Sequence, residues 1–178
     1  MQFSMRLVVL SQYYNDRNSE RQDEIDTCLR KNLENPAVDK VHLLNESDIS
    51  IPKEFLDHEK IVITETEFGK RMTYADAWRY ADTILEPGDV VALLNSDIYL
   101  DYTAPWSTVA RDFFGDPREN PRLQRRALDL SRHEVCTSGH AWIDGGIMQG
   151  GSKDVWVLQK RSKDEPLVSA KGLELFDF

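Results

Sequence analysis

The chain has 178 residues, of which 40% are hydrophobic and 10% aromatic, a composition typical of one globular domain. The formal net charge of −9 argues against a general nucleic-acid partner, because neutralising phosphates requires a basic surface. No apolar run approaches the roughly 18 residues of a membrane span, the N-terminus does not resemble a signal peptide, and two cysteines are too few for a disulfide framework, so we expect a cytoplasmic protein.

The first half of the chain alternates apolar, β-branched runs with segments of helical periodicity. In chain order it predicts a strand over 5–14, a helix over 15–35, strands over 38–47 and 59–67, a helix over 73–85 and a strand over 90–100. The helix over 15–35 has Asn18 or Ser19 as its cap, and the helix over 73–85 has Thr73.

The second half has a weaker pattern, with a predicted helix over 105–115, a strand over 127–137 and a glycine-rich segment from 138 that leads to an apolar run. Neither a repeat nor a linker divides the chain, so we expect a single domain over 1–178, which could be the N-terminal part of a longer protein. Strands that alternate with helices, several of them continuously apolar, predict an α/β fold: a three-layer α/β/α sandwich with a mostly parallel central sheet.

A polar triplet, Asn95, Ser96 and Asp97, follows the most apolar segment of the chain. Ligands of open parallel sheets bind at the carboxyl ends of the strands, and a carboxylate presented there suits a hard divalent cation. However, Asn, Ser and Asp side chains also stabilise turns. The triplet alone therefore leaves a binding role and a turn role open.

The motif order around this triplet resembles the nucleotide-sugar-binding half of glycosyltransferases with the A-type fold. It comprises SQYYND at the end of the first strand, then GKRMTYADAWRYAD, then VVALLNSDIYLD. More narrowly, R-x-T-Y-A-D, NSDIY and GSKDVW look like the motifs of small bacterial and viral glycosyltransferase-like proteins, over about Arg6 to Leu158. The resemblance implies a Rossmann-like nucleotide-binding sheet and an enzyme that moves a sugar from a nucleoside-diphosphate sugar, UDP ahead of GDP, to a glycan or other hydroxyl acceptor, with inversion expected.

Glycosyltransferases of this fold usually bind a divalent metal and the diphosphate with an Asp-any-Asp triplet. Here Asn95 stands at the first position, and an amide oxygen coordinates a cation without adding negative charge. By this resemblance the binding of Mn²⁺ or Mg²⁺ would depend on Asp97, and Asn95 and Ser96 would lie beside the nucleotide. Asp101 is expected outside the site.

Lys70 and Arg71 precede the predicted helix start at Thr73, where free N–H groups favour a diphosphate. A solvated pair of loop cations is the alternative for both residues. Asp76 could bind a ribose or sugar hydroxyl, or could simply stabilise the helix N-terminus.

The loop after the first strand, with Ser11, Gln12 and Tyr13, would hold the nucleoside according to the resemblance. One of Tyr13 and Tyr14 is expected to stack on the base, although tyrosines at strand ends are also ordinary packing residues. Asp154 in GSKDVW is similar in position to the catalytic acidic residue of inverting members, and it is the candidate base. A carboxylate at a helix N-terminus without a catalytic role is the alternative.

Two other functions remain open from the sequence. A non-catalytic module that binds nucleotide sugars or carbohydrates would account for Asn95. A sugar nucleotidyltransferase is the other alternative, but no glycine-rich phosphate loop follows the first strand.

Overall fold

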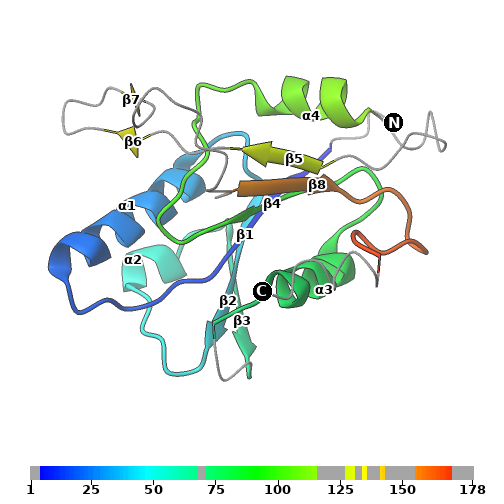
Figure 1. Cartoon of the computed structure of the whole chain (residues 1–178). Helices are drawn as coiled ribbons and strands as arrows, with labels where there is room; N and C mark the ends of the chain where they lie inside the picture. Colours follow the sequence, from blue (N-terminus) through cyan, green and yellow to red (C-terminus); the bar gives the residue numbers. More distant parts are fainter. Residues whose placement is uncertain are drawn as a thin grey trace.

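The computed structural model describes residues 5–67, 71–115, 127–130, 134–135, 141–142 and 155–169. These residues build a six-stranded sheet with helices packed against it (Figure 1). Its strands are β1 (Leu7–Ser11), β2 (Lys40–Glu46), β3 (Ile61–Thr66), β4 (Val90–Leu94), β5 (Ala127–Leu130) and β8 (Val155–Gln159). The helices are α1 (Ser19–Glu34), α2 (Lys53–Leu56), α3 (Tyr74–Ile84) and α4 (Trp106–Phe114), and β6 (Glu134–Val135) forms a separate pair with β7 (Ala141–Trp142).

The sheet has the strand order β3-β2-β1-β4-β8-β5. β1 pairs in parallel with β2 and β4, and β2 pairs in parallel with β3. β8 is antiparallel to both β4 and β5, so among these six strands β8 alone runs against the others. The prediction of an α/β fold with a mostly parallel sheet is confirmed.

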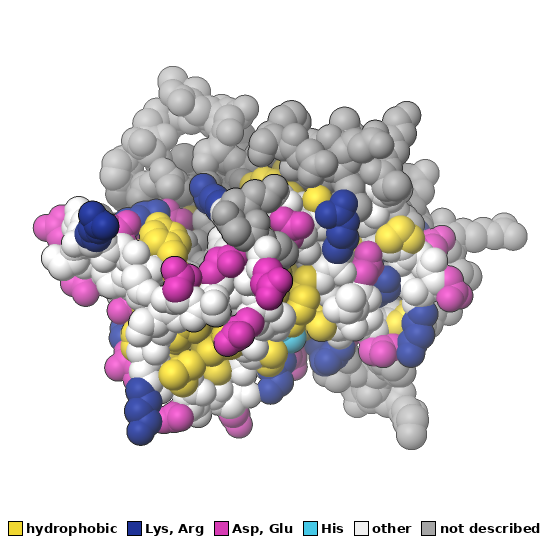
Figure 2. Space-filling view, turned by 90° about the horizontal axis from the view of Figure 1, so that it is seen from below, with side chains coloured by type: hydrophobic (Ala, Val, Ile, Leu, Met, Phe, Trp, Pro, Cys, Tyr) yellow, Lys and Arg dark blue, Asp and Glu magenta, His cyan; other side chains and the backbone are white. Residues whose placement is uncertain are grey.

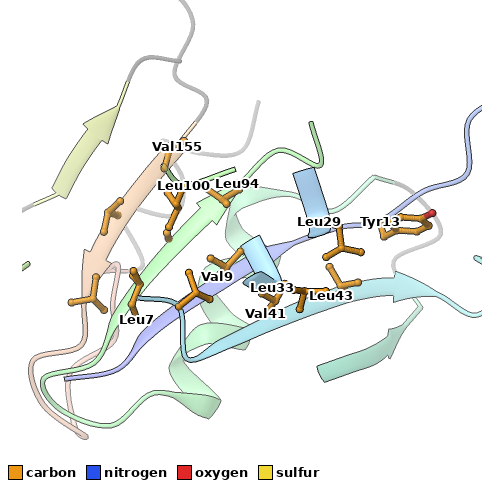
Figure 3. Close-up of a cluster of buried hydrophobic side chains, with 14 of the residues drawn as sticks. Leu7, Val9, Tyr13, Leu29, Leu33, Val41, Leu43, Leu94, Leu100 and Val155 are labelled. Carbon is orange, nitrogen blue, oxygen red and sulfur yellow. The ribbon is translucent and has the colours of Figure 1, made fainter. Parts of the chain in front are cut away.

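The helices cover both faces of the sheet because β1 and β4 are apolar on both sides, with every residue buried. On one face, Leu29 and Leu33 of α1 pack among Val9, Val41 and Leu43 of the sheet (Figure 3). On the other face, the buried side chains of α3 pack against the alternate residues of the same strands, in a cluster of Ala77, Trp78, Ala81, Val8, Leu10, Leu44, Val91 and Leu93. The predicted three-layer sandwich is therefore present.

The chain leaves β1 for β2 on one side and returns from β3 to β4 on the other side of β1. The strand order thus reverses between β1 and β4. In open α/β sheets the crevice outside the carboxyl ends of the strands at such a switch point is where ligands bind.

Two ion pairs lie away from those carboxyl ends. The guanidinium of Arg6, just before β1, pairs with the buried carboxylate of Asp89, just before β4. Lys160, which follows β8 and is 4% exposed, places Nζ 2.6 Å from a carboxylate oxygen of Asp82 on α3. These charges hold elements of the fold together and take no part in the crevice.

Some predicted bounds differ from the structure. The strand predicted over 90–100 ends at Leu94, and the strand predicted over 127–137 is divided into β5 and β6. The loop around Pro52 contains the short helix α2. No helix in the described ranges is long and apolar enough to cross a membrane.

Candidate functional site

A pocket of about 800 Å³ opens at the switch point between β1 and β4. This volume lies within the range of small-molecule sites, about 300–1,000 Å³. The described lining comes from the loop after β1, the first helical turn of α1, the end of β2 with the loop after it, the segment around the start of α3, and the end of β4 with the following triplet. Its residues are Gln12, Tyr13, Tyr14, Arg21, Glu46, Ile49, Arg71, Met72, Thr73, Tyr74, Leu93, Leu94, Asn95, Ser96 and Asp97.

The loop after β4 is held by two asparagines, Asn32 of α1 and Asn35 at the C-cap of the same helix. Asn32, which is 4% exposed, donates from Nδ2 to the carbonyl of Ile98 at 3.0 Å and accepts from the N–H of Leu100 at 2.9 Å. Asn35 donates to the carbonyl of Leu100 at 3.0 Å. Because these asparagines are the partners of these backbone groups, the loop that carries the polar triplet is attached to α1 and its C-cap and does not continue the hydrogen bonding of β4.

Asp97 forms an ion pair that crosses the pocket wall to α1. Nη2 of Arg21 lies 2.8 Å from Oδ2 of Asp97, and the two side chains are 35% and 14% exposed. Arg21 also pairs with Glu24 on the same helix and hydrogen-bonds Tyr14. The hydrogen bond from Arg21 to Asp97 is the main cause that raises the pKa of Arg21 above its ordinary value, so its charge is fixed.

The described residues give a divalent cation few ligands. No group of three or more His, Cys, Asp or Glu side chains in the described ranges is arranged to hold a metal ion. Glu46 and Asp97 are the carboxylates of the described lining, and Oδ2 of Asp97 already accepts from Arg21. Hard cations such as Mg²⁺ need about six oxygen ligands. This set does not fit a metal held by the protein alone, and dependence on Mn²⁺ or Mg²⁺ stays a prediction.

The loop after β1 divides into structural and pocket residues. Ser11 is buried, and its hydroxyl donates to the carbonyl of Leu94 at 3.0 Å, which joins β1 to β4; it is not part of the pocket lining. Gln12 does line the pocket, where its Oε1 accepts from the N–H of Met72 at 3.3 Å. Gln12 thereby ties this loop to the segment before α3.

Tyr13 and Tyr14 differ in burial. Tyr13 is 2% exposed, and its hydroxyl donates to Asp26 at 2.6 Å. Burial, followed by Asp26, raises the pKa of Tyr13. Tyr14 is half-buried, lines the pocket and contacts Arg21. Tyr13 borders the pocket from the core, so the tyrosine better placed to stack on a ligand is Tyr14.

One of the two cations predicted before α3, Arg71, lies in the wall of the pocket. Arg71 is exposed and lines the pocket; Lys70 lies outside the described residues. Thr73 and Asp76 form a reciprocal capping box, in which Oδ2 of Asp76 accepts from the N–H of Thr73 at 3.1 Å. The carboxylate of Asp76 is used by the helix cap and is not part of the described lining, so the structure favours the stabilising role over ligand binding.

Asp154, the candidate base, also lies outside the described residues. β8 begins at the next residue, Val155, which pairs with Leu94 at the carboxyl end of β4. The first described residue of β8 therefore lies beside a strand end that lines the pocket.

Sequence reasoning did not select Glu46, and it offered Tyr14 only as an alternative to Tyr13. It allowed Arg21 near the mouth of the site but favoured a surface ion pair with Glu20 or Glu24, and it did not predict the pair with Asp97. Glu46 is the last residue of β2, and Asn95 directly follows β4. The rule that ligands bind at the carboxyl ends of parallel strands, applied to β2 as well as to β4, would have selected Glu46. For Arg21 the sequence carries no such signal, because its partner Asp97 is 76 residues away along the chain.

Local cations matter here because the surface as a whole is acidic. In the view of Figure 2 several acidic side chains lie in a row across the middle of the face. With a net charge of −9, the protein as a whole does not attract an anion. Arg21 and Arg71 are the two cations of the described lining, and Glu46 and Asp97 are its two carboxylates. Positive charge in the pocket is therefore local to the two guanidinium groups.

No protein-family model matches the chain, and no curated protein matches it. Among solved structures, the chain is similar to one titled "Crystal structure of 4-diphosphocytidyl-2C-methyl-D-erythritol synthase". The TM-score is 0.43 and the sequence identity 10%, over 88% of this chain and 76% of that chain. A likeness this distant assigns no activity, so the function is argued from the pocket itself.

Proposed function

We propose that the chain is a transferase that binds a nucleoside-diphosphate sugar in the pocket between β1 and β4 and transfers the sugar to a hydroxyl acceptor. The observation that carries the proposal is a pocket of about 800 Å³ at the switch point of a mostly parallel sheet, with two arginines and three tyrosines in its described lining. The motifs that resemble A-type glycosyltransferases supply the substrate class, with UDP placed ahead of GDP.

In this proposal each part of the donor meets a different element. Tyr14 stacks on the base, since an aromatic face accepts any base without specific hydrogen bonds. Arg71 and the positive end of the α3 dipole face the diphosphate from one side. Asn95 and Ser96 lie beside the sugar nucleotide at the end of β4.

Transfer requires a base for the acceptor hydroxyl. Asp154 is proposed to take the hydroxyl proton as the acceptor oxygen bonds to the anomeric carbon and the bond from that carbon to the diphosphate oxygen breaks. The electron pair leaves with the nucleoside diphosphate, whose charge the arginines offset. Support for this role comes from β8, whose start at Val155 pairs with the pocket residue Leu94.

A non-catalytic module that binds nucleotide sugars is the second candidate. Two observations favour it: Asn95 replaces an acidic residue, and the carboxylate of Asp97 is already paired with Arg21. Both candidates predict donor binding, and turnover separates them.

The experiment combines a thermal-shift panel with product analysis. UDP-, GDP-, CMP- and dTDP-sugars are added with Mn²⁺ and separately with EDTA, because a ligand of the native state raises the apparent melting temperature. Release of the nucleoside diphosphate is then measured for the donor with the largest shift. Asp154→Asn should keep the shift and lose release, while the exposed control Asp164→Asn keeps both. A shift without release supports the module, and the absence of any shift contradicts both.

A further inference from the structure

We propose that Arg21, held by Asp97, is the built-in cation of this pocket and binds a phosphate group of the ligand without a divalent metal. This inference rests on the proposed nucleotide-binding function and specifies how its site meets negative charge. It also gives Asp97 a different role from the metal ligand that the motif implies: Asp97 is a positioning residue for Arg21.

The position of Arg21 is set by helix geometry. It lies in the first turn of α1, whose N-cap Asn18 accepts from the N–H of Glu20 at 2.9 Å. From there the guanidinium reaches the loop after β4, and that loop is fixed to the same helix through Asn32. One helix thus positions both the cation and its carboxylate partner, which limits the movement of the pair.

The guanidinium retains hydrogen-bonding capacity for a ligand. Among the described residues its partners are Asp97, Glu24 and Tyr14. A guanidinium has five N–H donors in a planar fork, a shape that matches phosphate as well as carboxylate. Its side chain is 35% exposed and lines the pocket, so part of the side chain is accessible to a ligand there.

In this arrangement the single carboxylate of the triplet after β4, Asp97, pairs with Arg21 instead of a metal. A metal would have to share Asp97 with an arginine whose Nη2 lies 2.8 Å from the carboxylate. The two cations would then compete for one negative charge, because Asn95 adds none. With Arg21 already present, the chain itself supplies one positive charge at the position where a metal would meet a diphosphate.

The test measures binding of UDP and of inorganic pyrophosphate by isothermal titration calorimetry, in excess EDTA and in Mn²⁺. Pyrophosphate reports the phosphate contacts alone, and UDP adds the nucleoside. The variants are Arg21→Gln, Arg21→Lys and Asp97→Asn. Arg30→Gln is the matched control: Arg30 lies on the same helix, pairs with Glu54 at 2.8 Å and is not part of the described lining.

Wild type should bind both probes in EDTA, and Mn²⁺ should change the affinity by less than about threefold. Loss of a charged hydrogen bond in Arg21→Gln should weaken binding about tenfold or more, with Arg21→Lys between the two and Arg30→Gln unchanged. Asp97→Asn should weaken binding less than Arg21→Gln, because the cation remains. Circular dichroism checks that every variant is folded. If Arg21→Gln is not folded, the affinity of Arg21→Lys is compared with that of wild type instead.

Binding that requires Mn²⁺, disappears in Asp97→Asn and survives in Arg21→Gln would overturn this inference while leaving the proposed function intact. Failure of UDP and pyrophosphate to bind under either condition would overturn both. Equal weakening by Arg21→Gln and Arg30→Gln would show a general charge effect and would also refute the role given to Arg21.

Discussion

His42 should make the protein less stable as the pH falls from 7 to 5. This side chain is 8% exposed in β2, and its Nδ1 lies 2.9 Å from the hydroxyl of Tyr80 on α3, which is also 2.8 Å from Oγ1 of Thr64. Burial, followed by the charges of Lys40 and Arg6, lowers the pKa of His42 to about 4. In the unfolded chain it returns to an ordinary value of about 6.5.

The sign follows from proton binding. Between pH 6.5 and pH 4 the unfolded chain binds a proton at His42 that the folded protein does not, so acid favours unfolding. Proton linkage with these two pKa values lowers the free energy of unfolding by about 2 kcal/mol between about pH 7 and pH 5, and the effect is fully present only below about pH 4. Above about pH 7 the contribution of His42 disappears.

Urea denaturation at several pH values between 7 and 5 measures this dependence. His42→Asn keeps a polar atom near the position of Nδ1 but cannot titrate. Between pH 7 and pH 5 its free energy of unfolding should therefore fall by about 2 kcal/mol less than that of wild type. His58→Asn is the control, because His58 takes no part in the contact with Tyr80, and it should keep the wild-type slope. The free energy of unfolding changes between pH 7 and pH 5 in both proteins. If that change differs between wild type and His42→Asn by less than about 0.5 kcal/mol, the assignment of His42 as a buried neutral histidine is wrong.

Three further substitutions test the site. Asn32→Leu should lower the free energy of unfolding by about 2–4 kcal/mol, because it leaves backbone groups of Ile98 and Leu100 without partners; a change below about 1 kcal/mol in urea denaturation would contradict this. Thr73→Ala removes half of the capping box and should cost about 1 kcal/mol, seen as a lower melting temperature; an unchanged value would mean that the cap adds nothing. Asn95→Asp adds a carboxylate beside Asp97 and should increase the thermal shift caused by Mn²⁺; no increase would show that the two side chains do not share a cation.

The sheet and its helices were predictable because local patterns determine them. The continuous apolar runs of β1 and β4 require cover on both faces, and the stripe of Ile25, Cys28, Leu29 and Leu33 predicts the buried face of α1. The Thr73 cap was predictable for the same reason, since its partner lies three residues away.

The length of β4 was not predictable in this way. Ile98 and Leu100 continue the apolar pattern after the triplet, but their backbone groups bond to asparagines in α1 and at its C-cap instead of a neighbouring strand. Asn32 carried a signal nonetheless: it occupies the helical phase of the buried stripe, and a buried amide needs partners. The sequence does not say which distant loop supplies them.

The stripe of α1 also links the two contacts that define the candidate site. Arg21 and Asn32 are separated by about three helical turns and therefore lie on the same side of α1. Asn32 holds the backbone at Ile98, while Arg21 holds the side chain of Asp97. A phosphate group that binds the remaining donors of Arg21 leaves the contacts of Asn32 in place, because they do not involve that guanidinium. A ligand can thus bind at Arg21 while the loop after β4 stays attached to the helix.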